Sequence, residues 1–126
     1  MRAVDTNVLV RLLVRDDLKQ AAAVEAFIAP GTWVSVLALA EAIWVMRSAY
    51  KVTAEGLGDG IAILLNHRHL VIQDFDAVAE ALRVFRSRPS LGFTDCLMLQ
   101  LARKAGHFPL GTFGRKLSSV EGTHRL

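Results

Sequence analysis

Short apolar runs alternate with longer amphipathic stretches along the chain. Runs of three or four β-favouring apolar residues indicate strands, and apolar residues recurring every three or four positions indicate helices. The first run ends at Val4, and further strands are expected at 32–34, 70–72 and 110–112, with a short edge strand within 122–126. The stretches between them have helical spacing. This alternation predicts an α/β protein with a mostly parallel sheet covered on both faces.

Side chains that accept hydrogen bonds from backbone N–H groups mark the expected helix starts. These starts are Thr6 or Asn7, the pair Asp16-Asp17, Ser35, Thr53, Asp74 or Asp76, and Thr94. Pro30-Gly31, residues 88–90 and Gly106 supply stop signals. No linker, repeat or low-complexity tract interrupts the pattern, so we expect one domain over residues 1–126.

Composition narrows the class of protein. A chain of 126 residues with 52% hydrophobic and 21% charged residues is typical of a compact globular domain. The longest uncharged apolar stretch, 30–40, is too short to cross a membrane, and Asp5 interrupts the apolar start that a signal peptide would need. Cys96 is the only cysteine, which favours the reducing cytoplasm. The net charge of +3 is compatible with a nucleic-acid partner.

Glu41 is the most informative single residue. It is the only charged residue from 32 to 46, and its neighbours at helical spacing are Leu37, Trp44 and Val45. We therefore expect it on a buried or half-buried helix face. A lone buried carboxylate costs several kcal/mol unless it is paired, protonated or bound to a metal. An internal salt bridge to an Arg is the alternative.

Asp5 and Asp95 also end or interrupt apolar segments near strand-to-helix junctions. Each has a purely structural alternative, a local turn for Asp5 and a favourable first-turn position in the helix dipole for Asp95. Taken with Glu41, however, they form a set of hard oxygen ligands without His or Cys. Such a set suits Mg²⁺ or Mn²⁺, and we expect the three carboxylates to converge on one cation.

The sequence gives little support for other kinds of active or binding site. The histidines lack zinc-ligand spacing and are interpreted as surface residues, and the serine pair 118–119 lacks a nucleophile elbow. Cys96 follows Asp95, which raises a thiol pKa, so a core thiol is expected. Gly56, Gly58 and Gly60 lack the phosphate-loop pattern and indicate a loose helix start. The remaining candidates are interpreted as a solvated helix face: Arg83, Arg86 and Arg88.

Four short motifs follow one another along the chain: Val4-Asp5-Thr6-Asn7, Ala38-Leu39-Ala40-Glu41, Phe93-Thr94-Asp95 and Gly111-Thr112-Phe113. In this order and at these separations they resemble the PIN-domain nucleases, and specifically the VapC-type toxins of bacterial toxin–antitoxin pairs. The resemblance covers essentially the whole chain.

The resemblance implies a three-layer α/β/α sandwich, Mg²⁺-dependent (or Mn²⁺-dependent) endoribonuclease activity on RNA, a homodimer, and a cognate antitoxin that covers the acidic pocket. Asp5 and Asp95 would bind the metal directly, and Glu41 would complete the acidic cluster directly or through water. The resemblance implies that Thr6, Asn7 and Thr112 hold the metal ligands in position or orient the substrate.

Gly114 departs from the family pattern, which usually has a fourth acid at this position, and Gly92 replaces another common acid. A naturally one-metal or weakened enzyme, an inactive relative and an introduced inactivating substitution all fit this departure. The competing hypothesis is a non-catalytic module that binds antitoxin, RNA or operator-bound complex. A haloacid-dehalogenase-type phosphatase is a third choice, but it needs an Asp where the chain has Asn7.

Overall fold

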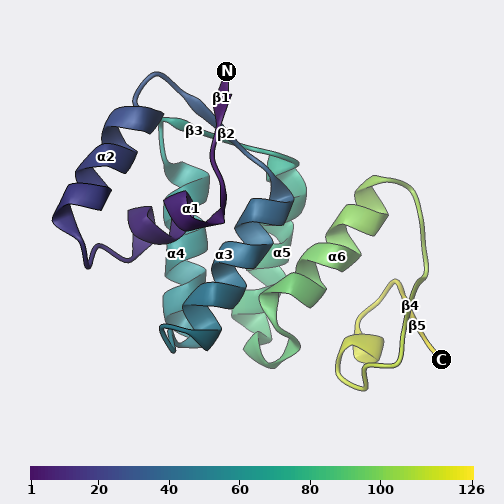
Figure 1. The fold of residues 1–126 in the computed structure, drawn as a ribbon. Helices are drawn as coiled ribbons and strands as arrows, with labels where there is room; N and C mark the ends of the chain where they lie inside the picture. Colours follow the sequence, from purple (N-terminus) through teal and green to yellow (C-terminus); the bar gives the residue numbers. More distant parts are fainter. The chain divides into compact units, whose positions relative to one another are not determined.

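A computed structural model describes all 126 residues, which form two compact units, Met1–Phe75 and Asp76–Leu126 (Figure 1). The first contains β1 (Arg2–Ala3), α1 (Thr6–Leu13), α2 (Leu18–Ile28), β2 (Thr32–Val34), α3 (Val36–Ser48), α4 (Ala54–Asn66) and β3 (Leu70–Ile72). The second contains α5 (Phe75–Ser87), which begins at the boundary, a 3₁₀ turn (Pro89–Leu91), α6 (Phe93–Lys104), β4 (Leu110–Thr112), a 3₁₀ turn (Leu117–Ser119) and β5 (Thr123–Arg125).

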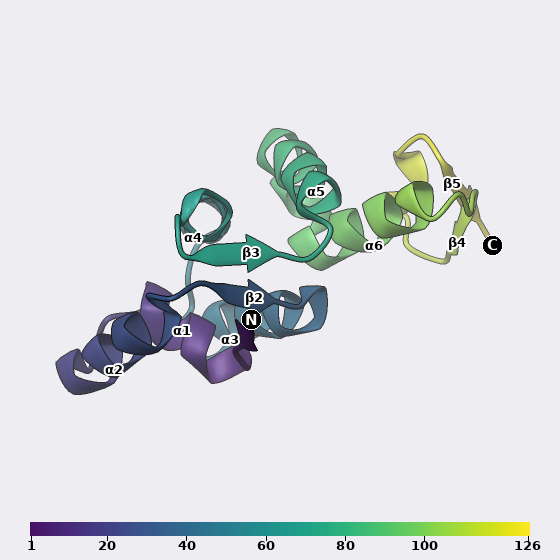
Figure 2. The same ribbon diagram turned by 90° about the horizontal axis from the view of Figure 1, so that it is seen from above.

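The sheet of the first unit has the order β1-β2-β3, and both pairings are parallel. Figure 2 shows β2 and β3 side by side and pointing in the same direction. Arg2 pairs with Thr32, and Thr32 pairs with Leu70. Because all three strands run the same way, Asp5 after β1 and Ser35 after β2 follow the carboxyl ends of their strands, at the edge where α/β sheets bind ligands.

Helix α1 packs against both α2 and α3 in the first unit. Its apolar spacing buries Leu9 and Leu12, as a 3.6-residue period requires. Helix α4 begins after Thr53, as expected, and runs without a break through its three glycines, so the weakening of its first turns stays a prediction. A Cβ on Gly60 would make ordinary van der Waals contacts, at 3.5 Å from side-chain atoms of Leu13 and Met46, so this glycine lies on the packed face of α4.

The second unit has its own small sheet, in which β4 and β5 pair in parallel. The edge strand expected within 122–126 is present, but it pairs with β4 alone. Helix α5 buries an apolar stripe that ends at Phe85, whose ring meets Phe93 of α6 edge-on with 6.0 Å between ring centroids. Lys104 at the end of α6 forms a 2.6 Å ion pair with Asp76 at the start of α5.

The predicted α/β class with parallel strands is confirmed, as are the four expected main strands at 32–34, 70–72, 110–112 and before Asp5. No helix is long and apolar enough to cross a membrane.

Candidate metal centre

Asp5 lies directly at the junction between β1 and α1. Its backbone is extended, and its Oδ1 accepts a hydrogen bond of 3.3 Å from the backbone N–H of Val8, so Asp5 caps α1. The prediction that Thr6 or Asn7 caps this helix is therefore wrong, since Thr6 is already its first helical residue. The structural alternative for Asp5, a local side-chain-to-backbone bond, is present. The side chain remains exposed, and its second oxygen, Oδ2, accepts no hydrogen bond.

Glu41 is brought to this junction by the packing of α1 against α3. The hydroxyl of Thr6 donates a 2.8 Å hydrogen bond to Oε2 of Glu41, across 35 residues of chain. Thr6 follows Asp5 directly, so this bond ties Glu41 to the residue beside the capping carboxylate. The first unit thereby joins two of the predicted site residues, Thr6 and Glu41, directly, and Asp5 is linked to this pair as the residue before Thr6. The Oε1 of Glu41 accepts no hydrogen bond.

The expected burial of Glu41 is wrong. Its side chain is exposed, and its helical neighbours Leu37 and Trp44 are 69% and 66% exposed. Helix α3 buries instead the face that contains Ala42 and Met46. The error has a physical cause: α3 is apolar nearly all round, so its sequence does not show which face turns inward. Exposure also removes the need for an internal salt bridge, and Glu41 forms none.

Asp95 lies in the first turn of α6 in the second unit, where it is half-buried. Burial raises the pKa of its carboxyl group, and no neighbouring cation offsets this cost. The expected cap at Thr94 is wrong, because α6 begins at Phe93, two residues before the expected start at Asp95, and Gly92 occupies the cap position without a side-chain bond. A half-buried carboxylate without a cationic partner gains from binding a cation.

Thr112 and Gly114 are joined by a local turn at the end of β4. The backbone N–H of Gly114 donates a 2.9 Å hydrogen bond to Oγ1 of Thr112. A Cβ on Gly114 would lie 3.1 Å from that oxygen, so an acid here needs only a small shift of the Thr112 side chain. Gly92 differs, because its φ of +81° is a left-handed conformation that other residues rarely adopt.

Asn7 does not join the acids through a hydrogen bond. It lines a pocket of about 340 Å³ with Arg11 of α1 and residues of α2, including Gln20 and Val24. Within neither unit does a group of three or more His, Cys, Asp or Glu residues take a metal-holding arrangement. The convergence of Asp95 with the acids of the first unit therefore stays a prediction, as do the orienting roles of Asn7 and Thr112.

The other titratable residues take structural positions. Cys96 is buried as expected, and burial, followed by the charge of Asp95, raises its pKa. Contrary to the expected surface placement, His67 and His69 are half-buried, and they line a pocket of about 380 Å³ with Glu25. The backbone N–H of His69 donates to Nδ1 of His67, which fixes that nitrogen as an acceptor.

Comparison with known families gives one result. The family model described as PIN domain matches residues 2–122, which is nearly the whole chain. A search of curated proteins finds no match.

Proposed function

The chain belongs to the PIN-domain family, and on that premise we propose that it is a metal-dependent endoribonuclease that acts as the VapC-type toxin of a toxin–antitoxin pair. PIN domains are in general metal-dependent nucleases that use Mg²⁺ or Mn²⁺. The observation that supports the proposal is the hydrogen bond from Thr6 to Glu41, because Thr6 directly follows Asp5, the residue at the carboxyl end of a parallel strand.

The donor set fits a hard cation. Asp5 and Glu41 each keep one carboxylate oxygen without a hydrogen bond, and the neighbouring hydroxyl of Thr6 is also an oxygen donor. Oxygen ligands of this kind suit Mg²⁺ and Mn²⁺. When bound there, the cation supplies positive charge for phosphate oxygens and for the activation of water.

One backbone group and one side chain orient the two proposed ligands. The N–H of Val8 fixes one oxygen of Asp5, and the hydroxyl of Thr6 fixes one oxygen of Glu41, so the remaining oxygens have defined directions. We assign Asp95 as the third ligand, because its uncompensated, half-buried carboxylate is stabilised by a nearby cation.

Cleavage of RNA by the purified protein is the direct test. We expect cleavage of single-stranded RNA with Mg²⁺ or Mn²⁺, loss of cleavage in excess chelator, and recovery when Mg²⁺ is restored. Equal cleavage in chelator would contradict the metal mechanism.

Two exposed apolar side chains on the same face of α3 as Glu41 support the proposal that a partner protein binds there. A protein that covers Leu37 and Trp44 would also cover the carboxylate between them on α3. We therefore propose a cognate antitoxin that blocks the acids, a toxin that forms a homodimer, and a cytoplasmic location, which the single buried thiol of Cys96 supports. Growth arrest on expression in a bacterial host, relieved by co-expression of the antitoxin, tests the toxin role, and analytical ultracentrifugation tests the dimer.

Gly114 supports the second candidate, a catalytically impaired module that binds antitoxin or nucleic acid. No carboxylate is available at this position, yet a Cβ would meet only the Thr112 hydroxyl closely. Gly114→Asp should therefore fold, and Gly114→Ala is its matched control. Cleavage by the Asp variant alone would make this chain an impaired nuclease, whereas equal cleavage by all three proteins would show that the fourth acid is dispensable.

A further inference from the structure

Positive charge is concentrated at the end of the chain. Residues 103–126 contain five Lys or Arg residues and one Glu, a net charge of +4, whereas the whole chain carries +3. The first 102 residues therefore carry a net charge of −1. We name residues 103–126 the basic segment. Lys104 already pairs with Asp76, and the exposed cations that remain are Arg115, Lys116 and Arg125. A polyanion is therefore attracted more strongly to this segment than to the rest of the chain.

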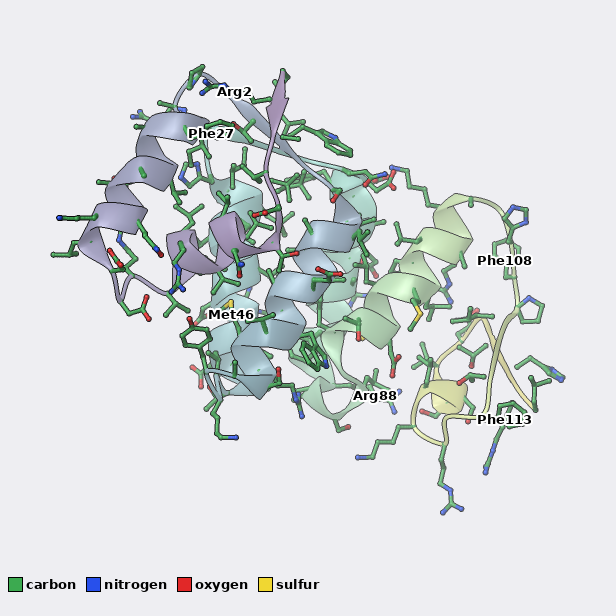
Figure 3. The ribbon with its side chains drawn as sticks, in the orientation of Figure 1. Arg2, Phe27, Met46, Arg88, Phe108 and Phe113 are labelled. Carbon is green, nitrogen blue, oxygen red and sulfur yellow. The ribbon has the colours of Figure 1, made fainter.

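Two aromatic rings of the basic segment are exposed. Phe108, just before β4, is 64% exposed, and Phe113, just after β4, is 79% exposed (Figure 3). The strand itself keeps the two rings at opposite ends of a fixed backbone. Proteins that bind single-stranded nucleic acid commonly combine exposed aromatic rings with cations, because every base has a π-face that stacks on an aromatic side chain.

Phe108 also borders a defined pocket of about 540 Å³, which it lines with Arg103, Pro109, Glu121 and Gly122. The guanidinium of Arg103 is held in place because its Nη2 donates to the backbone carbonyl of Glu121. A Cβ on Gly122 would lie 2.6 Å from that Nη2, so glycine is what allows the guanidinium to lie against the backbone. The pocket thus combines an aromatic face with a fixed guanidinium.

These features together specify one ligand chemistry. We propose that this pocket receives a base of single-stranded RNA, stacked on Phe108 beside Arg103, while the flanking phosphates are held by the exposed cations of the basic segment. The pocket has the size of small-ligand sites, which are about 300–1,000 Å³. Glu121 disfavours a phosphate inside it, so the base enters and the backbone stays outside. The inference rests on the proposed function, since it names where that substrate is held.

Binding without cleavage tests the base site. The Kd of a 5′-labelled single-stranded 12-nucleotide RNA is measured by fluorescence anisotropy in excess EDTA. Phe108→Leu keeps an apolar side chain but removes the π-face, and should raise the Kd roughly fivefold or more. Phe108→Trp keeps a π-face and should therefore bind the RNA with a Kd close to that of wild type. Phe75→Leu, at a half-exposed ring outside the segment, is the matched control and should leave the Kd unchanged.

The phosphate contacts are tested by salt dependence. Lys116→Gln should lower the slope of log Kd against log salt concentration by about 0.7, the value for one phosphate contact on a single strand. Lys19→Gln removes the same charge from α2 and should leave the slope unchanged.

Three outcomes would overturn the inference. The first is an unchanged Kd for Phe108→Leu. The second is equal binding of duplex RNA, which has no free base to stack. The third is displacement of the RNA by polyglutamate with equal affinity for wild type and Phe108→Leu, which would make the segment a site for an acidic protein. Cleavage assays separate this inference from the nuclease proposal: Mg²⁺-dependent cleavage with unaltered Kd values refutes only the base site, and Phe108-dependent binding without cleavage refutes only the nuclease.

Discussion

Asp5 has one observed role, as a helix cap, and one proposed role, as a metal ligand, and substitutions can distinguish them. As the cap of α1 it accepts one backbone hydrogen bond from Val8, at 3.3 Å. As a proposed ligand it must carry negative charge. Asp5→Asn keeps an acceptor oxygen and removes the charge, whereas Asp5→Ala removes both. Asn is as good a cap as Asp, so only the charge differs between wild type and the Asn variant.

The expected magnitudes follow from these contacts. Loss of the cap in Asp5→Ala should lower the free energy of unfolding by about 0.5–1 kcal/mol, the lower part of the usual range, because the bond is long and exposed. For a chain of this size that corresponds to about 2–5 °C in Tm. Asp5→Asn should change Tm by less than about 2 °C. Both variants should lose roughly 100-fold or more in cleavage rate, since a metal ligand contributes several kcal/mol to the transition state.

Cleavage of labelled RNA in Mg²⁺ and thermal unfolding by circular dichroism provide the two measurements. Thermal unfolding repeated with and without Mg²⁺ adds a third, because a ligand that binds only the folded state raises Tm. We expect Mg²⁺ to raise the Tm of wild type and to have little effect on Asp5→Asn. If Asp5→Asn cleaves RNA at the wild-type rate while Asp5→Ala loses only stability, Asp5 is a helix cap and the metal assignment is refuted.

Three further predictions follow from individual contacts. Thr6→Val should leave Glu41 without its hydrogen bond and raise the Mg²⁺ concentration needed for half-maximal cleavage, whereas Thr6→Ser should preserve it; equal Mg²⁺ requirements in all three proteins would contradict the positioning role. Burial lowers the pKa of His67 in the folded protein. The stability that neutral His67 contributes is therefore present above its unfolded pKa of about 6.5 and is lost as the pH falls below that value. Tm should decline from pH 7 to pH 5.5 in wild type and should decline less in His67→Asn. Gly60→Ala should raise the free energy of unfolding by about 0.5–1 kcal/mol, because a Cβ at this position makes ordinary contacts. Gly56→Ala should raise it less or lower it, because its Cβ would lie 2.8 Å from a valine methyl group. Urea denaturation of the two variants and wild type measures the difference.

The strands and most helix starts could be predicted because their signals are local. Ser35 and Thr53 cap α3 and α4 as expected, since each side chain accepts a hydrogen bond from the backbone three residues on. The prediction failed at Thr94, where a glycine with positive φ begins the helix by backbone conformation alone. A threonine in the first turn of a helix looks the same in the sequence as a threonine that caps it, and only the backbone angles distinguish the two positions.

The candidate site was predictable as a set of residue types and not as contacts. Asp5 and Glu41 were identified from charges placed in apolar surroundings, but the bond from Thr6 depends on how α1 crosses α3. The sequence also does not indicate which side of α3 is exposed, because apolar residues occupy nearly the whole circumference of this helix. The pocket beside Phe108 was missed although a signal existed: the concentration of positive charge in the basic segment is visible in the sequence.

The distribution of charge supports separate functions for the first 102 residues and for the basic segment. The first 102 residues, which supply all three proposed metal ligands, have a net charge of −1, and the basic segment has +4. A carboxylate cluster repels the phosphates of RNA until a cation neutralises it, so the acids alone cannot hold the substrate. The exposed cations and rings of the basic segment attract RNA without any metal. Because binding and metal loading then depend on different residues, salt concentration should act mainly through KM and Mg²⁺ concentration mainly through kcat.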